Sequence, residues 1–176
     1  VQAVNWGKAS GSLPIPAGNP PFKIIASEQF ALETLRKFKT RALANYAEDR
    51  NRADLSGTSH LSHALAHGEI HPRTILGELG GSASEEVFRK EIAWREFYAD
   101  VMFHNPHTFD QYLEPRFANM RYESVENNKL LEAWYKGQTG YPMVDAAMRQ
   151  LQATGWIHNR ARMIVASFLV KDLHLE

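Results

Sequence analysis

The sequence predicts an all-α protein, and three observations support that prediction. No stretch alternates apolar and polar residues for long enough to make a sheet. Apolar side chains recur instead at helical spacing, as at Val144, Ala147 and Met148. Residues that begin and end helices bracket such runs: Pro142 suits a first helical turn, and Gly155 suits a helix end.

The bulk composition limits the classes of protein that fit. A chain of 176 residues with 44% apolar residues is long enough for one domain with a sizeable core. Its formal net charge of zero argues against a broad electrostatic grip on nucleic acid, although a local basic patch is compatible with it. There is no cysteine, no membrane-spanning stretch and no signal peptide, so we expect a cytoplasmic protein that does not act at a membrane.

The first part of the chain divides into a linker and a helix. Residues 1–26 are rich in Gly, Pro and Ser and read as an extended linker, whereas residues 27–176 carry the helical pattern. Ser27 is a suitable N-cap for a helix that we expect to run to about Arg50. The side chains expected to face the core of this helix are Phe30, Leu35, Phe38, Ala42 and Tyr46.

Two short helices are expected next. Thr58 and Ser59 would open the first, which Gly68 closes, and Pro72 would start the second, which ends at about Leu79. A helix start with two hydroxyls and free N–H groups suits an anion. The simpler alternative is that these hydroxyls only cap the helix.

A long helix should follow, capped by Ser82 or Ser84 and ending before Pro106. Glu91 and Arg95 are four residues apart on it and can pair with each other. The apolar side chains expected to face the core are Val87, Ile92, Phe97 and Val101, with Trp94 nearby.

Residues 105–126 read as a long irregular segment, and a segment of that length is often functional. Asn127 or Asn128 would then start a helix that runs to Lys136.

The final stretch, residues 139–173, contains two helix patterns around one hinge. The first ends at Gly155, the second runs from Asn159 to Leu173, and Trp156 lies between them. A tryptophan ring beside guanidinium and amide groups can hold a planar ligand that carries phosphate. The simpler alternative is a core tryptophan, with the arginines solvated or paired with acidic neighbours. The arginines and acids concerned are Arg149, Arg160, Arg162, Asp145 and Asp172.

Several long, ungapped motifs resemble one family. They are TGYP-x-VDAAMRQL, TGW-x-HNR-x-RM and ASFLVKDL near the end, preceded by Tyr46 with Arg50, GTS-x-LS at 57–62 and EIAWREFY at 91–98. Together they resemble the FAD-binding helical domain of the DNA photolyase/cryptochrome family, closest to class I cyclobutane pyrimidine dimer photolyases. The match extends from about Phe30 to Leu173. The chain has neither a GxGxxG motif nor a Walker loop, so its nucleotide would not be held in a Rossmann or P-loop manner.

The resemblance implies a domain organisation. Residues 27–176 would form a bundle-like, N-terminal portion of the FAD-binding helical domain. The antenna domain, with its antenna chromophore, and the C-terminal part of the FAD domain would be absent from this chain.

The resemblance also implies a site that needs no metal. FAD would be bound by Tyr46, Thr58, Ser59, Leu61, Ser62, Arg95, Trp156, Asn159 and Arg162. The repair chemistry would involve Glu91, Trp94 and Met163. DNA would be contacted by Arg50, Trp94 and Arg160.

The activity that the resemblance implies is that of a deoxyribodipyrimidine photolyase, a lyase that acts on UV-damaged DNA. Excited, reduced FAD would donate an electron that splits the cyclobutane dimer, and the electron would then return. One alternative is a cryptochrome-like photoreceptor without repair activity. Another is a helical fragment, inactive by itself, that binds no cofactor and associates with itself through exposed apolar surface.

The chain departs from the family at several positions. His60 stands where the family usually has arginine, and Phe88 stands where it often has tryptophan. The surface tryptophan that often ends the family's photoreduction chain has no counterpart, and Tyr122 is the closest aromatic residue. The histidines at 60, 63, 67 and 71 would form one helical stripe. Without an HExxH pattern we expect them to be solvated or at helix ends, with no metal.

Overall fold

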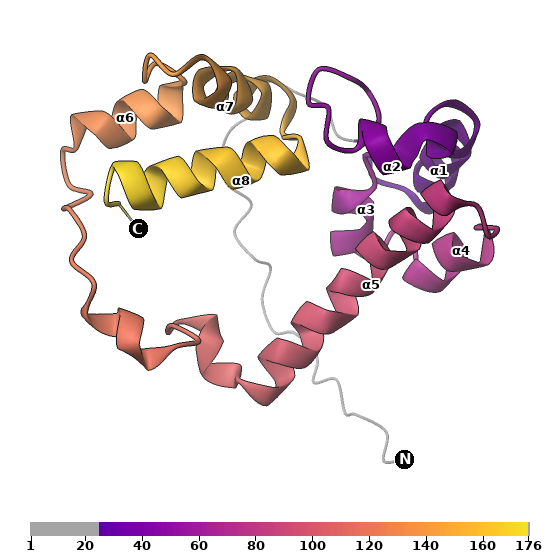
Figure 1. Ribbon diagram of the computed structural model, residues 1–176, viewed down its shortest axis with the longest axis horizontal. Helices are drawn as coiled ribbons and strands as arrows, with labels where there is room; N and C mark the ends of the chain where they lie inside the picture. The colour runs from indigo at the N-terminus through magenta and orange to yellow at the C-terminus, as the bar shows by residue number, and fades with distance from the viewer. Residues whose placement is uncertain (1–24, 176) are drawn as a thin grey trace.

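The computed structural model describes residues 25–175, and this part of the chain is helical without strands (Figure 1). The linker predicted for residues 1–26 therefore lies almost entirely outside the described residues. The α-helices are α1 (Glu28–Arg41), α2 (Tyr46–Asp49), α3 (Ser62–Ala66), α4 (Pro72–Gly77), α5 (Ala83–His104), α6 (Lys129–Lys136), α7 (Pro142–Thr154) and α8 (Asn159–Ser167). Short 3₁₀ turns span Leu43–Asn45, Pro106–Phe109 and Pro115–Asn119, and Phe168–Asp172 continues α8 as a wider π-helical turn.

The first five helices enclose one hydrophobic core, which we call the N-terminal core. The rings of Phe38, Tyr46 and Phe88 meet at its centre, with centroids 4.8–5.6 Å apart. Edge-to-face contacts of this kind add to the free energy of burying the rings. The other buried members are Ala31, Leu35, Leu43, Leu61, Ala64, Ile70, Ile75 and Ile92.

Helices α6, α7 and α8 pack together around a second core, the C-terminal core (Figure 1). Its buried members are Val144, Ala147, Met148, Ile157, Ala161 and Val165. Trp134 of α6 packs against it and donates its indole N–H to the Val165 carbonyl at 3.0 Å. The loop before α7 is held by Asp145, whose carboxylate accepts from the Thr139 hydroxyl at 2.6 Å and from two backbone N–H groups. The bond to the hydroxyl holds the pKa of Asp145 below its usual value.

The long helix α5 leads the chain out of the N-terminal core. It starts with a capping box, in which Ser82 accepts from the Glu85 N–H and the Glu85 carboxylate accepts from the Ser82 N–H. Its first half packs into the N-terminal core through Phe88 and Ile92. Its second half runs out toward the connecting segment, after which the chain turns back to α6 (Figure 1).

Two contacts join parts of the chain that are far apart in sequence. The Arg160 guanidinium donates from Nε to Asn51 Oδ1 at 2.9 Å. The imidazole of His60 stacks on the indole of Trp156, with ring centroids 4.0 Å apart and planes inclined by 32°. These contacts place the start of α8 and the preceding hinge against the loops of the N-terminal core.

Several sequence expectations about the helices were correct. Ser27 accepts the Phe30 N–H at 3.1 Å as the N-cap of α1, and Asn128 caps α6. Gly155 ends α7 with φ +68°, a conformation that costs glycine little.

The expected length of the first helix was wrong, because it ends at Arg41 and not near Arg50. The backbone leaves the helical region at Ala42, with φ −129°, and the next turn directs Leu43 and Tyr46 into the core. Burial of these side chains outweighs the helical propensity of the segment.

The expected helix start at Thr58 and Ser59 was also wrong. His60 has φ +54°, which no α-helix accommodates, so α3 begins at Ser62. The histidine stripe is broken for the same reason: His63 is in α3, whereas His71 caps α4 by accepting the Arg73 N–H.

Two expectations about α5 need correction. Phe97 does not face the core, because its side chain is 52% exposed; Phe88 occupies that face together with Ile92. Glu91 does not pair with Arg95 but with Arg50, at 2.7 Å between Oε1 and Nη1.

No helix among the described residues is long and apolar enough to cross a membrane. Within residues 25–175, no group of three or more acidic, histidine or cysteine side chains is arranged to hold a metal ion.

Candidate cofactor and DNA-binding site

A cavity of about 190 Å³ lies where the loop before α3, the first half of α5 and the start of α8 meet. We call it the cofactor cavity, because it brings together eight of the nine side chains expected to bind FAD. Those eight are Tyr46, Thr58, Ser59, Leu61, Ser62, Trp156, Asn159 and Arg162. The ninth, Arg95, lines a neighbouring groove. Sequence reasoning did not place Leu65, Phe88 or Ile92 in this wall, where the structure finds them.

The loop that carries the hydroxyls is fixed by close packing. A Cβ atom at Gly57 would lie 2.8 Å from Cβ of Asp49, so only glycine lets the loop approach α2 this closely. Leu61 is fully buried and anchors the other end of the loop in the N-terminal core. Thr58 and Ser59 are thereby held at the cavity wall between these two anchors.

The polar groups of the cofactor cavity fit an anionic, hydrogen-bonding ligand. Among the described residues, the side chains of Thr58, Asn159 and Arg162 have no hydrogen-bond or ion-pair partner, and they are free to bind a ligand. A guanidinium with free N–H donors matches phosphate oxygens, and hydroxyl and amide groups add further hydrogen bonds. Burial raises the pKa of the Tyr46 hydroxyl, so it stays protonated and can donate.

A larger groove of about 870 Å³ adjoins the cofactor cavity, and we call it the outer groove. It brings together every residue expected to take part in repair chemistry or DNA contact. Those residues are Glu91, Trp94, Met163, Arg50 and Arg160, joined by Arg95. The cavity and the groove share Arg50, Glu91, Asn159 and Arg162 in their walls, so a ligand in one would lie next to a ligand in the other.

The charged side chains of the outer groove are held by specific contacts. Arg50 forms its ion pair with Glu91 and places its guanidinium 5.7 Å from the centre of the Tyr46 ring. Arg160 is held by Asn51 and approaches the Met163 sulfur at 3.5 Å. The sequence motifs do not reveal these pairings, because the partners come from different parts of the chain.

The exposed side of the groove is aromatic. The Trp94 ring is 49% exposed and lies 5.2 Å from Phe97 and 5.9 Å from Tyr98, centroid to centroid. An exposed aromatic ring beside arginines can stack on a nucleic-acid base while the guanidiniums bind phosphate. Tyr98 was not anticipated, although its spacing of four residues from Trp94 places it on the same helix face.

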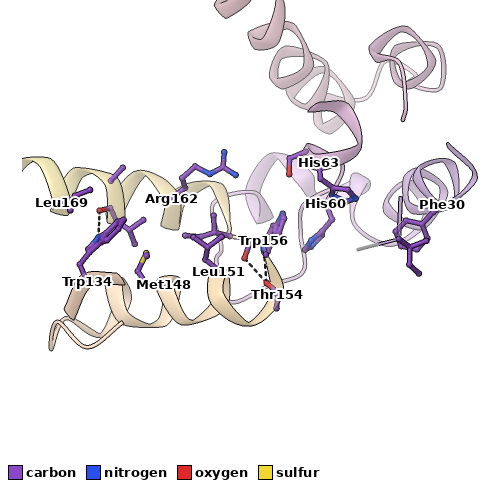
Figure 2. Close-up of a pocket in the computed structure, with 16 residues that line it drawn as sticks. Phe30, His60, His63, Trp134, Met148, Leu151, Thr154, Trp156, Arg162 and Leu169 are labelled. Atoms are coloured by element: carbon purple, nitrogen blue, oxygen red, sulfur yellow. Dashed lines mark hydrogen bonds between the residues drawn. The ribbon is translucent and has the colours of Figure 1, made fainter. Parts of the chain in front are cut away.

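A third cavity, of about 570 Å³, is lined by Trp156 and by residues on both sides of it in the sequence, such as Phe30 and Leu169 (Figure 2). Its walls are mainly apolar, and they include Trp134, Met148 and Leu151 of the C-terminal helices. It shares His60, Ser62, Trp156, Ile157 and Arg162 with the cofactor cavity, so the Trp156 hinge forms part of both walls. We call it the inner cavity.

The three arginines expected near Trp156 have different environments. Arg162 lines both cavities and the outer groove. Arg160 lines the outer groove but neither of the two cavities. Arg149 points elsewhere, since its guanidinium donates to the Gly137 carbonyl at 2.6 Å.

Two histidines near the hinge have lowered pKa values, chiefly because they are buried. For His60, the neighbouring His158 and His63 lower the pKa further, and for His158 the Arg160 guanidinium does so. His158 accepts the Arg160 N–H through Nδ1 at 3.2 Å, so its neutral form caps α8. Its buried Nε2 has no partner among the described residues.

The fold and the site together define an all-α domain with an interhelical pocket for a planar, phosphate-bearing ligand beside an exposed aromatic and cationic groove. A family model described as the FAD binding domain of DNA photolyase matches residues 88–176. The chain belongs to this family.

Individual relatives agree with this assignment. The deoxyribodipyrimidine photo-lyase of Escherichia coli is 42% identical over 159 residues, which cover 85% of this chain and 33% of that protein. The crystal structure of a class III photolyase from Agrobacterium tumefaciens superposes with a TM-score of 0.79 at 41% identity, covering 85% of this chain and 32% of that one. A cryptochrome from Synechocystis gives a TM-score of 0.71 at 29% identity, with coverage of 89% and 34%. The chain spans about a third of the length of the curated relatives it resembles.

Proposed function

We propose that this chain is the N-terminal portion of the FAD-binding domain of a deoxyribodipyrimidine photolyase, a light-driven enzyme that splits cyclobutane pyrimidine dimers in UV-damaged DNA. The observation that carries the proposal is the convergence of two residue sets on adjoining spaces. Eight of the nine expected FAD contacts line the cofactor cavity, and all expected repair and DNA contacts line the outer groove. On this proposal, the antenna domain and the rest of the FAD domain belong to the remainder of the parent protein.

In the cofactor cavity, the polar side chains hold the ligand by hydrogen bonds and charge. Thr58, Ser59 and Ser62 donate hydroxyl hydrogen bonds to the diphosphate. Asn159 and Arg162 hold the ring and ribityl side from α8, and Arg95 completes that side from α5. Reduced FAD, when bound and excited by light, supplies the electron that opens the cyclobutane ring and accepts it back afterwards.

In the outer groove, the side chains receive a dimer flipped out of the duplex. Flipping costs a few kcal/mol, and it costs least at a damaged and poorly stacked step. Trp94 stacks on the dimer, Glu91 accepts hydrogen bonds from its base edge, and Met163 fills the space between the dimer and the cofactor cavity. Arg50 and Arg160 bind the phosphates on either side of the lesion.

The first test is a titration of this chain with FAD, followed by flavin fluorescence and absorbance. We expect saturable binding that is lost in an Arg95→Ala, Arg162→Ala double variant. Arg116→Ala is the matched control, because Arg116 is exposed and pairs with Glu114 away from both cavities and the groove. Saturable binding that survives in the double variant would overturn the assignment of the cofactor cavity.

A cryptochrome-like photoreceptor without repair activity is the second candidate, and the structural similarity to the Synechocystis cryptochrome favours it. The two candidates differ in the outer groove, since repair requires Trp94 and Glu91 to hold a lesion there. Light-dependent loss of dimers from UV-irradiated oligonucleotides, measured with the parent protein, separates them. Flavin photochemistry without any loss of dimers would support the photoreceptor.

A further inference from the structure

His60 is the only residue with a left-handed backbone among those lining the cofactor cavity in the described part of the chain. Its φ of +54° is uncommon for a residue other than glycine, although histidine is among the side chains that tolerate it best. A residue kept in an uncommon conformation by its surroundings often serves the site in which it lies. Here the conformation turns the imidazole away from α3 and toward the Trp156 hinge.

His60 lines both the inner cavity, as Figure 2 shows, and the cofactor cavity. Its stack on Trp156, at 4.0 Å between centroids, fixes its plane. Neither ring nitrogen has a hydrogen-bond partner among the described residues, although the side chain is half-buried. A held imidazole with both nitrogens free, between Thr58, Ser59 and Ser62 in sequence, is placed to bind the same ligand as these hydroxyls.

We propose that His60 is a further cofactor-binding residue and that it makes FAD affinity depend on pH, by hydrogen bonding to the diphosphate as an imidazolium. This inference rests on the proposed function of the cofactor cavity. It adds a residue to that site and a condition under which the site binds most tightly.

The charges around His60 explain why binding of an anionic ligand should cause the imidazole to take up a proton. Without a ligand, burial and the nearby His158 and His63 lower its pKa, so the ring is neutral at neutral pH. The cationic Arg162 and Arg50 face the same cavity, with Glu91 as the acidic group there. An anionic diphosphate brings an opposite charge next to the ring and raises its pKa. Binding of FAD is therefore accompanied by proton uptake.

The sign of the pH effect follows from this linkage. Affinity is highest below the lowered pKa of the free protein, falls as pH rises through the interval between the free and bound pKa values, and is constant above it. The change in affinity across the interval is about tenfold for each pH unit by which binding raises the pKa. Histidine titrates in the accessible range between about pH 5 and pH 8.

The test compares two ligands and three variants by fluorescence titration between about pH 5.5 and pH 8. Riboflavin has the flavin ring but no diphosphate, so only FAD should bind more weakly as pH rises. His60→Asn keeps a side chain that tolerates the backbone conformation, and it should remove the pH dependence. His60→Arg, with a fixed charge, should bind FAD tightly at every pH. His104→Asn is the matched control, because His104 is exposed and lines neither cavity nor the outer groove, and it should behave as wild type.

The possible outcomes separate this inference from the function on which it rests. A pH dependence that persists in His60→Asn would overturn the role of His60, leave FAD binding intact and point to His158. A pH dependence that riboflavin shares would also overturn the role of His60 and leave FAD binding intact. Absence of saturable FAD binding at every pH would overturn the proposed cofactor site and this inference together. Far-UV circular dichroism of each variant shows that it is folded, and the comparison of the two ligands needs only the wild-type chain.

Discussion

Replacing Arg50 and Glu91 singly and together measures how much their ion pair stabilises the wall that the cofactor cavity and the outer groove share. The pair joins the turn after α2 to the middle of α5, and both residues line both spaces. Arg50→Met and Glu91→Gln remove the charges while keeping most of the side-chain volume. The double variant completes a cycle from which the coupling free energy of the pair is obtained.

The magnitude follows from the geometry of the pair. The nitrogen and oxygen are 2.7 Å apart, and the two side chains are only 18% and 29% exposed. Two unit charges about 4 Å apart attract by about 4 kcal/mol at an effective dielectric constant of about 20. Desolvation and side-chain ordering cancel part of this, and a hydrogen bond to a charged group contributes about 1.5–3 kcal/mol net. We therefore expect a coupling free energy of ~1–2 kcal/mol.

The assay is urea unfolding of the wild type and the three variants, followed by circular dichroism and analysed by linear extrapolation. Arg52 and Asp54 provide the control cycle, because their ion pair is even shorter, at 2.5 Å, but the side chains are 59% and 61% exposed. Water screens such a pair, so its coupling should be much smaller. A coupling between Arg50 and Glu91 no larger than that of the control pair would refute the reasoning.

Three further predictions concern the stability of the fold and the recognition of DNA. Phe38→Ala, which removes the ring between Tyr46 and Phe88, should lower the free energy of unfolding by about 3–5 kcal/mol, and Phe38→Leu by clearly less. The chain should lose stability as pH falls below about 6.5, because His60 and His158 take up protons in the unfolded state, whereas their lowered pKa values keep them neutral in the folded state. Urea midpoints at a series of pH values measure this, and equal midpoints would contradict it. In the parent protein, Trp94→Ala should weaken binding of dimer-containing DNA by about 1–3 kcal/mol, with an unchanged dissociation constant as the contrary result.

Much of the fold could be predicted because helix boundaries depend on local chemistry. Asn128 and Ser27 cap their helices as their side-chain oxygens allow, and Pro142 and Gly155 delimit α7 through their backbone preferences. The two helix boundaries that were wrong depend on tertiary contacts. The break at Ala42 exists because Leu43 and Tyr46 are buried, and the helical spacing predicted the burial of Tyr46 but not the break.

In the candidate site, as in the fold, the sequence predicted some features, whereas others depend on tertiary contacts. The family-like motifs contain eight of the nine expected FAD contacts, which line the cofactor cavity, and all the expected repair and DNA contacts, which line the outer groove; the roles that the resemblance implies for them stay predictions. The pairings inside the site could not be predicted in this way. Glu91 has Arg95 four residues away on its own helix, yet it pairs with Arg50 from α2. The stack between His60 and Trp156 likewise joins residues that only the folded chain brings together.

Helix α5 has 22 residues, so a small tilt near its start produces a larger displacement farther along it. Its capped end at Ser82 acts as the pivot, the buried side chains of Phe88 and Ile92 support its first half, and Trp94 lies farther from the pivot, in the outer groove. Trp94 is eleven residues beyond Ala83, or about 17 Å along the axis, so a tilt of about 10° would displace it by about 3 Å. A change in the packing under Phe88 and Ile92 that tilts the helix in this way would therefore move the Trp94 ring by nearly the thickness of a base, while Thr58 and Ser59, which lie on a separate loop, stay in place. On the proposed function, substitutions that touch neither DNA nor FAD would thus change how well the outer groove holds a lesion.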